Sequence, residues 1–286
     1  LTSASAAPNA RSGPATSPKS MLPSMATTEA DRGAVPGLSH IRRLEAAAFR
    51  AWPSASTYYD GTWSIRLTPG HPSRRLNSVN PLDPNDHSEL SDRIARAEAR
   101  FAVTGRPLTF RQTPLASREL EQYLHDEGFL RDHESCVMAM PLAGFNPDQA
   151  LNQIPLKDIQ RYAQASVTVR GQEEGNAEAL ASVIDSIVPP HSLFVHEDAS
   201  GPVSTVMCVR DGDLAGILDL GTRADARRQG HGASALATAL KWARNQGALT
   251  AWLQVELDSD PALALYRDFG FEEVYRYVYR IRASAK

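Results

Sequence analysis

A short run of basic and glycine residues, Arg227 to Gly232 (RRQGHG), lies between a predicted strand and a predicted helix. Glycines at such a junction let the backbone turn tightly and leave N–H groups open to a ligand, and the helix N-terminus adds partial positive charge. With its two arginines, the run predicts a cradle for a pyrophosphate. Because glycine is common at strand–helix turns, a purely structural turn is the alternative. Two other phosphate loops are excluded: no Gly-Lys-Ser/Thr follows, and Ala235 replaces the third glycine of a dinucleotide fingerprint.

Three further segments follow that loop in order. A predicted helix ends at Gly247, a β-rich run covers 249–256 (LTAWLQVE), and a short helix leads into Gly-Phe over 262–271 (ALALYRDFGF). Together the loop and these segments resemble the GNAT superfamily of acyl-CoA-dependent N-acetyltransferases. The resemblance covers residues 176–282, and it is specific at two separated places, the loop and the Leu265-Tyr266-x-x-x-Gly270-Phe271 segment.

The resemblance implies acetyl-CoA as the acyl-donor substrate and assigns its pyrophosphate to the loop. Arg227, Gly230 and Gly232 match the signature of the family's loop. The other residues of the turn would offer backbone N–H groups: Arg228, Gln229, His231 and Ala233. The preceding strand would pair its backbone with the peptide-like pantetheine arm, through Leu218, Leu220 and Gly221. One position departs from the family's pattern, because Ser259 stands where an asparagine often helps to hold the pantetheine; a shorter polar contact is expected there.

By the same resemblance, Tyr266 stands where the family often places its general acid. A phenol has a pKa near 10, so it is protonated at neutral pH and can give its proton to the departing thiolate. The alternative is a core aromatic residue on a helix face. The group that takes the proton of the amine is expected near the splayed strands, and the candidates are Asp219 and Glu256. For both, a solvated carboxylate at a strand end is the alternative.

Composition excludes several other classes of protein. The 286 residues carry 30 Lys+Arg and 33 Asp+Glu, a formal net charge of −3, which argues against a general binder of nucleic acid. No apolar run is long enough for a membrane span. The histidines lack metal-ligand spacing and the two cysteines, Cys136 and Cys208, are isolated, so no metal ion is expected. Two cysteines cannot form a disulfide framework, which fits a reducing, cytoplasmic location.

Residues 1–37 are mostly Ser, Ala, Pro, Thr and Gly without an aromatic residue, and this composition predicts a disordered segment. The chain opens on Leu1, with Met21 and Met25 following, so its start is expected to be trimmed or over-extended. The two halves that follow, 38–146 and 147–286, repeat the order strand, loop, helix, strand, short helix, Gly-Phe, strand. The expected fold is therefore α+β: two tandem GNAT-like domains, each with a mixed, mostly antiparallel sheet flanked by helices.

The first half lacks the features that carry chemistry in the second. In place of the glycine loop it has Asp83-Pro84-Asn85-Asp86-His87, whose carboxylates would repel a pyrophosphate. At the place of Tyr266 stands Leu124, which has no proton to give. The first half is therefore expected to be a GNAT-like domain without the cofactor loop, a tandem arrangement similar to that of mycothiol synthase-like enzymes. An unrelated α+β domain is the alternative.

These features together predict an enzyme that moves an acetyl group from acetyl-CoA to a primary amine by direct attack in a ternary complex. The acceptor would be a small molecule or a protein, either at its N-terminus or at a lysine; neither nucleic acid nor a membrane is expected as a partner, and a homodimer is left open. The alternative is a non-catalytic, acyl-CoA-binding regulatory protein in which Tyr266 only packs.

Overall fold

The computed structural model describes residues 37–282, so the predicted disorder of 1–37 lies, apart from Gly37, outside the described residues. The strands are β1 (Ser56–Asp60), β2 (Trp63–Leu67), β3 (Ser78–Pro81), β4 (Thr109–Gln112), β5 (Leu130–Pro141), β6 (His191–Asp198), β7 (Gly201–Asp211), β8 (Leu214–Thr222), β9 (Thr250–Glu256) and β10 (Glu272–Ile281). The α-helices are α1 (Leu38–Ala51), α2 (Leu90–Val103), α3 (Arg118–Asp126), α4 (Ile159–Arg170), α5 (Gly175–Asp185), α6 (His231–Asn245) and α7 (Asp260–Asp268). None of these helices is long and apolar enough to cross a membrane.

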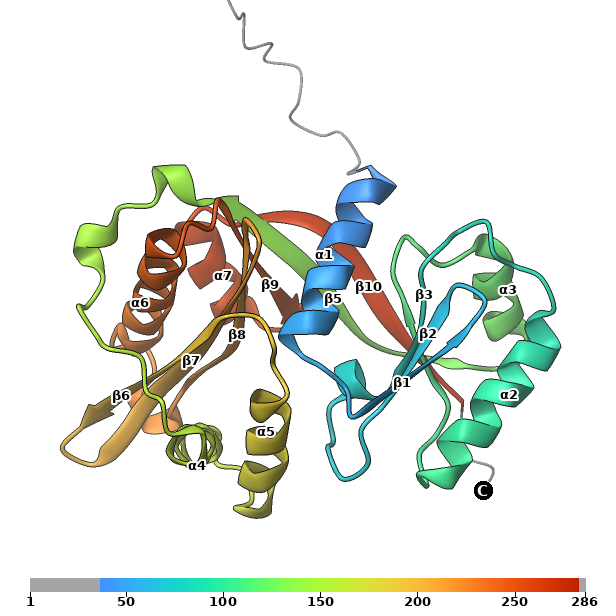
Figure 1. Ribbon diagram of the computed structural model, residues 1–286, viewed down its shortest axis with the longest axis horizontal. Helices are drawn as coiled ribbons and strands as arrows, with labels where there is room; N and C mark the ends of the chain where they lie inside the picture. The colour runs from blue at the N-terminus through green and yellow to red at the C-terminus, as the bar shows by residue number, and fades with distance from the viewer. Residues whose placement is uncertain (1–36, 283–286) are drawn as a thin grey trace, which may run out of the picture. The chain divides into compact units, whose positions relative to one another are not determined.

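All ten strands form one mixed sheet, in the order β1-β2-β3-β4-β10-β5-β9-β8-β7-β6 (Figure 1). Neighbouring strands pair antiparallel except β3 with β4 and β8 with β9, which are parallel. The predicted α+β class, with a mostly antiparallel sheet flanked by helices, is confirmed.

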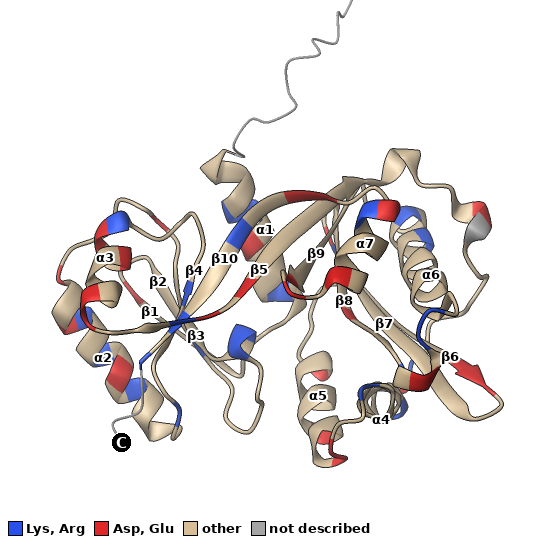
Figure 2. Ribbon diagram, turned by 180° about the vertical axis from the view of Figure 1, so that it is seen from behind, with Lys and Arg blue, Asp and Glu red and all other residues tan. Residues whose placement is uncertain are grey.

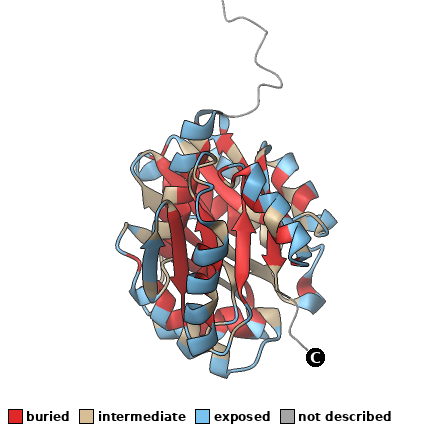
Figure 3. Ribbon diagram, turned by 90° about the vertical axis from the view of Figure 1, so that its right-hand side faces the viewer, coloured by how far each residue is buried: buried red, intermediate tan, exposed pale blue. Residues whose placement is uncertain are grey.

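Alternating side chains divide the second half of the sheet into two buried faces. On β8, Ala215 and Ile217 pack with α6 and α7, whereas Leu214 packs on the opposite face with α1, α4 and α5. This alternation follows from the two-residue period of a strand. A third cluster joins β2, β3 and β4 to α2 and α3. Figure 3 shows the result: buried strands lie between helices whose outer faces are exposed.

The predicted repeat appears as β3-α2-β4-α3-β5 in the first half and β8-α6-β9-α7-β10 in the second. The last strand of each repeat, β5 or β10, is inserted beside strands of the other repeat. β10 lies between β4 and β5, and β5 pairs with β9 from Ser135 opposite Glu256 to Pro141 opposite Thr250. Helix α1 also crosses to the second half, where Arg50 Nε donates to Asp211 Oδ2 at 2.7 Å. The division into 38–146 and 147–286 stays a prediction.

Helix α4 is an element that the sequence patterns do not predict. Its run Val167-Thr168-Val169 alternates as a strand would, and β-branched residues favour strands. The ends decide the outcome: the Asp158 side chain accepts from the Arg161 N–H, and Gly171, at φ +62°, ends the helix. This helix brings Ser166 and Arg170 to the functional site, as described below.

A carboxylate fills the loop of the first half that corresponds to the glycine loop. Asp86, between β3 and α2, accepts from the Thr62 N–H at 2.9 Å, from Thr62 Oγ1 at 2.6 Å and from Arg93 Nη1 at 2.7 Å. Burial works against the charged form of Asp86, but the hydrogen bonds from Arg93 and Thr62 outweigh it and lower its pKa to about 2. This loop is thus closed by a side chain of the protein itself.

Asp86→Asn is expected to destabilise the protein by about 2 kcal/mol at pH 7, because the shifted pKa measures the gain from ionisation in the folded state. Since the folded-state pKa lies below that of the unfolded chain, this stabilisation is complete above about pH 4 and is lost as the pH falls towards 2. Urea unfolding of both proteins between pH 7 and 2.5 measures the difference. Asp83→Asn, in an exposed pair with Arg42 in the same loop, is the control and should cost under about 1 kcal/mol. If the difference in unfolding free energy between wild type and Asp86→Asn stays constant as the pH falls, the ionised carboxylate of Asp86 is not the source of the stabilisation.

Candidate active site

Strands β8 and β9 separate after a short parallel contact. They pair only from Leu214 opposite Thr250 to Gly216 opposite Trp252. On its other edge β8 stays paired with β7 as far as Thr222. Beyond Gly216 the β8 backbone therefore has one edge without a partner strand, and this stretch holds the predicted pantetheine-binding residues Leu218, Leu220 and Gly221. An extended, peptide-like ligand can add to such an edge through main-chain hydrogen bonds.

A β-bulge at Asp219 fixes this part of β8. Between the partners Met207–Leu218 and Thr205–Gly221, β8 has one residue more than β7, and Asp219 adopts φ +53°. Its carboxylate is held by α4, because it accepts from Tyr162 Oη at 2.9 Å and from Ser166 Oγ at 2.7 Å and pairs with Arg170 Nη2 at 2.9 Å. Asp219, one of the two predicted bases, thus ties the bulged strand to α4.

The glycine loop enters α6 with its backbone turned outward. Gly230 immediately precedes the helix at φ +85°, and Arg228 also has positive φ, +64°. Within residues 37–282, no acceptor takes the N–H groups of Gly232 and Ala233 in the first turn. A side chain at Gly232 would place its Cβ 3.1 Å from Thr222 Oγ1. Free N–H groups at a helix N-terminus, next to the exposed side chains of Arg227 and Arg228, fit a diphosphate. The other predicted loop residues, Gln229 and His231, lie in the same turn.

Tyr266 lies on α7 and lines a cavity of about 250 Å³ with Leu218, Leu220 and Gln254, named here the Tyr266 cavity. Its ring packs edge-on against Phe271, with centroids 5.9 Å apart. Burial raises the pKa of Tyr266 to about 12, against the opposing charges of Arg75 and Arg170, so the phenol is protonated at neutral pH. Ser259 immediately precedes α7, half-buried and without a side-chain cap bond to the helix.

A larger cleft of about 620 Å³ continues from the Tyr266 cavity. Both are lined by Trp52, Ser73, Arg75, Arg170 and Asp219. The cleft, named here the large cleft, extends to Glu256 and Tyr277. Glu256, the second predicted base, is exposed at the end of β9, and its carboxylate has no ion pair or hydrogen bond among the residues that the structure describes.

One group of possible metal ligands lies beside Glu256. Side-chain atoms of His133, Glu256 and Asp258 lie within 4.8 Å of one another, and all three residues are exposed. Exposed acidic groups are common without an ion, so this proximity by itself assigns no metal to the site. The sequence, for its part, predicts no metal ion here.

Several residues of the two cavities are not found by sequence reasoning: Trp52, Arg75, Arg170 and Tyr277. Trp52, Arg75 and Arg170 lie outside the segment 176–282 that carries the resemblance. For Tyr277 a signal exists, because Tyr275, Tyr277 and Tyr279 alternate along the last strand and must share one face. Arg75 is in a short 3₁₀ helix, Arg74–Leu76, which Figure 2 shows as a blue turn beside β3.

The continuous sheet, the separated strands β8 and β9 and the glycine loop before α6 define an acetyltransferase of the GNAT superfamily. Comparison with known proteins confirms this class. A family model described as "Probable histone acetyltransferase Rv0428c C-terminal" matches residues 38–280, and the chain belongs to that family.

Individual relatives agree with this membership. The chain is 24% identical over 255 residues to the "Uncharacterized N-acetyltransferase YobR" of Bacillus subtilis (strain 168), a match that covers 86% of this chain and 100% of that protein. The solved GCN5-related N-acetyltransferase from Kribbella flavida is similar with a TM-score of 0.65 at 20% identity, over 85% of this chain and 96% of its own. A tandem GNAT protein from the clavulanic acid biosynthesis pathway is similar with a TM-score of 0.53 at 15% identity, over 88% of this chain and 90% of that protein.

Replacing both Gly230 and Gly232 by Val is expected to abolish stabilisation by acetyl-CoA. The two side chains would block approach to the backbone of the loop, and a ligand at 100 times its Kd otherwise stabilises the folded state by about 2.7 kcal/mol. Thermal unfolding with and without acetyl-CoA measures the shift. Gly105→Val is the matched control, since Gly105 also has positive φ, +66°, with open space around it, but ends α2 in the first half. A folded double variant that keeps the full shift would show that the loop does not hold the pyrophosphate.

Proposed function

We propose that this protein transfers an acetyl group from acetyl-CoA to a primary amine by direct attack in a ternary complex. The observation that carries the proposal is the junction of two cavities: the Tyr266 cavity lies against the open edge of β8, and it continues into a large cleft that ends at Glu256. A donor and an acceptor can therefore meet between a protonated phenol and a free carboxylate.

Acetyl-CoA supplies an activated thioester carbonyl to this site. The loop residues Arg227 to Ala233 would hold its pyrophosphate through free N–H groups and two guanidinium groups. The edge of β8 from Leu218 to Gly221 would hold the pantetheine arm, with Ser259 as a further polar contact at the start of α7. The arm would then lead the thioester towards Tyr266.

Tyr266 acts in this scheme as the general acid. Its phenol gives a proton to the sulfur as the carbon–sulfur bond breaks. Because burial keeps the pKa of Tyr266 near 12, this proton is present across the physiological range of pH.

Glu256 is the better placed of the two predicted bases. Asp219 pairs with Arg170 and accepts hydrogen bonds from two hydroxyl groups, so its oxygens are already engaged by α4. Glu256 has no such partner among the described residues and opens into the large cleft. We therefore assign to Glu256 the proton that the attacking amine loses, and to Asp219 the positioning of the β8 bulge.

The acceptor is a primary amine of a small molecule or of a protein, and the family's description names a histone acetyltransferase. We further propose a cytoplasmic reaction. Both cysteines are free and buried, and burial raises the pKa of the Cys136 thiol to about 11, as suits structural thiols in a reducing compartment.

Tyr266→Phe is expected to lower kcat by about 100- to 10,000-fold, the usual contribution of a general acid, while acetyl-CoA affinity changes little. The variant keeps the ring and its contact with Phe271 and removes only the proton. The loss should appear equally in kcat and kcat/KM, measured by CoA release with a panel of amines. The paired control, Leu124→Ala at the corresponding place in the first half, removes a fully buried side chain and should cost about 2–5 kcal/mol of stability without lowering kcat. Unchanged turnover in Tyr266→Phe would show that Tyr266 is not the general acid. If the wild-type protein binds acetyl-CoA but acetylates no amine of the panel, the alternative of a regulatory protein is supported.

Glu256→Gln and Asp219→Asn separate the base from the positioning residue. Glu256→Gln should lower kcat by about 100-fold or more, the usual contribution of a general base, with little change in acetyl-CoA affinity. Because Glu256 is exposed and unpaired, stability should change by less than about 0.5 kcal/mol. Asp219→Asn should instead cost roughly 1–3 kcal/mol of stability, since it breaks the pair with Arg170. Unchanged kcat in Glu256→Gln, with a loss of about 100-fold or more in Asp219→Asn, would reverse the assignment.

A further inference from the structure

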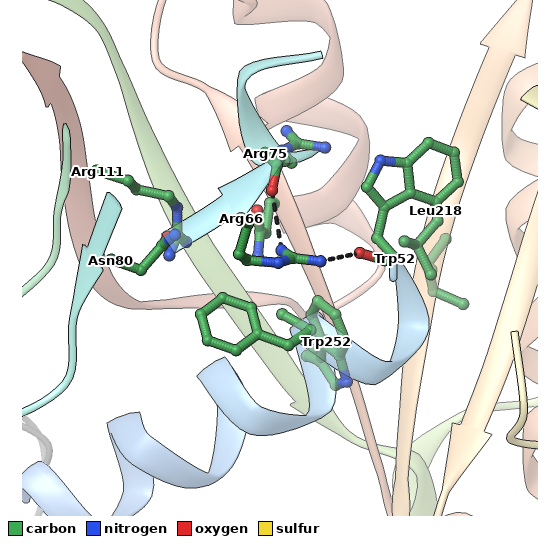
Figure 4. A pocket seen from close by; sticks show the side chains of 11 residues that line it. Trp52, Arg66, Arg75, Asn80, Arg111, Leu218 and Trp252 are labelled. Carbon is green, nitrogen blue, oxygen red and sulfur yellow. Dashed lines mark hydrogen bonds between the residues drawn. The ribbon is translucent and has the colours of Figure 1, made fainter. Parts of the chain in front are cut away.

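Three guanidinium groups gather in a small pocket at the inner end of the active site, with no carboxylate in the pocket lining. Figure 4 shows Arg66, Arg75 and Arg111 around this pocket, on the side of the sheet covered by α1. Arg111 forms a buried bidentate pair with Glu45, which offsets one positive charge. Arg66 donates instead to the carbonyls of Arg75, at 2.9 Å, and of Trp52. The region thus holds more positive than negative charge.

The arginines that line the large cleft differ in their partners. Arg74 Nη2 lies 2.5 Å from Asp132 Oδ2, and Arg170 Nη2 lies 2.9 Å from Asp219 Oδ1. Arg75 has no carboxylate partner among residues 37–282. Its side chain makes a single hydrogen bond there, from Nε to Tyr277 Oη at 3.4 Å.

Arg75 also occupies the place where the cavities join. It lines the small pocket, the large cleft and the Tyr266 cavity, and it is half-buried. A guanidinium carries five N–H donors in a planar fork, so the terminal nitrogens of Arg75 have capacity for a ligand. Removing a cation from water without a counter-charge is unfavourable, and an anionic group in the cleft would supply that charge.

The positive charge of Arg75 also acts on the neighbouring phenol of Tyr277. Burial acts to raise the pKa of Tyr277, but the positive charges of Arg75 and Arg111 outweigh burial and lower it. The Arg111 Cζ lies 3.8 Å from the centroid of the Tyr277 ring, so the same tyrosine faces both cations. Tyr277 Oη in turn donates to Gln254 Oε1 at 3.1 Å, so its oxygen accepts from Arg75 Nε while its proton is directed to Gln254.

We propose that the acceptor is a small amine that bears a carboxylate, and that the unpaired fork of Arg75 binds this carboxylate in the large cleft. The inference rests on the proposed acetyl transfer and names its substrate class. A single unpaired guanidinium matches one negative charge and the planar, two-oxygen geometry of a carboxylate. Arg66 acts as a positioning residue, because it fixes the backbone of Arg75 and the carbonyl of Trp52.

Binding of matched ligand pairs tests the proposal without relying on turnover. Each pair is an amino acid and the amine left after its decarboxylation: lysine and cadaverine, phenylalanine and phenethylamine. With the protein saturated by CoA, calorimetry is expected to show at least tenfold tighter binding of each amino acid. Arg75→Gln should weaken amino-acid binding about 10- to 100-fold, the loss expected for charge-assisted hydrogen bonds, and leave the matched amines unchanged. Arg75→Lys keeps the charge but not the fork, and should recover part of the affinity.

Arg74→Gln is the matched control, because Arg74 is already paired with Asp132, and it should keep the preference for carboxylates. Arg75→Gln should fold normally, since only the bond to Tyr277 is lost, and thermal unfolding checks this. Three results would each overturn the proposal. They are equal binding of amino acids and their matched amines, tighter binding of O-phosphoethanolamine than of any amino acid, and tighter binding of a lysine-rich peptide than of any amino acid. Amino-acid binding that depends on Arg75 without acetyl transfer would uphold the carboxylate site and reject the proposed reaction.

Discussion

The site depends on how early the parallel pairing between β8 and β9 ends. Only three residue pairs connect the two strands, and beyond Gly216 the backbone of β8 has an open edge. Backbone N–H and C=O groups must find partners, so an edge of this kind inside a fold is stable only where water or a ligand supplies them. The bulge at Asp219, held by Tyr162, Ser166 and Arg170 of α4, keeps that edge in place.

The first half of the chain supplies one wall of the active site, although it lacks the residues expected to bind a nucleotide. Trp52 and Arg75 come from the first half and line the same cavity as Tyr266. The exchange of β5 and β10 explains how they are brought there, because Tyr277 of β10 is hydrogen-bonded to Arg75 across 202 residues of sequence. In the first half the carboxylate of Asp86 occupies the loop that is open in the second.

Sequence reasoning finds the elements whose signals are local. The glycines before α6 and the short helix that leads into Gly270-Phe271 are signals within a few residues, and the structure has α6 and α7 where they predict them. The exchange of strands is not predictable in this way, since β5 and β10 have similar apolar patterns and only tertiary packing selects their partners. Arg75 is missed for the same reason: its position in the site depends on residues distant in sequence, such as Tyr277 and Tyr266.

The position of β10 also bears on synthesis of the chain. Its residues, Glu272–Ile281, pair on one side with β4 and on the other with β5. Until they emerge, the facing edges of those two strands, made more than a hundred residues earlier, have no β10 to pair with. Unpaired edges are sites of aggregation, and contacts between distant segments form slowly. The central sheet therefore closes only once β10 has been made, and a chain that stops before β10 would have two unpaired strand edges in the middle of its sheet.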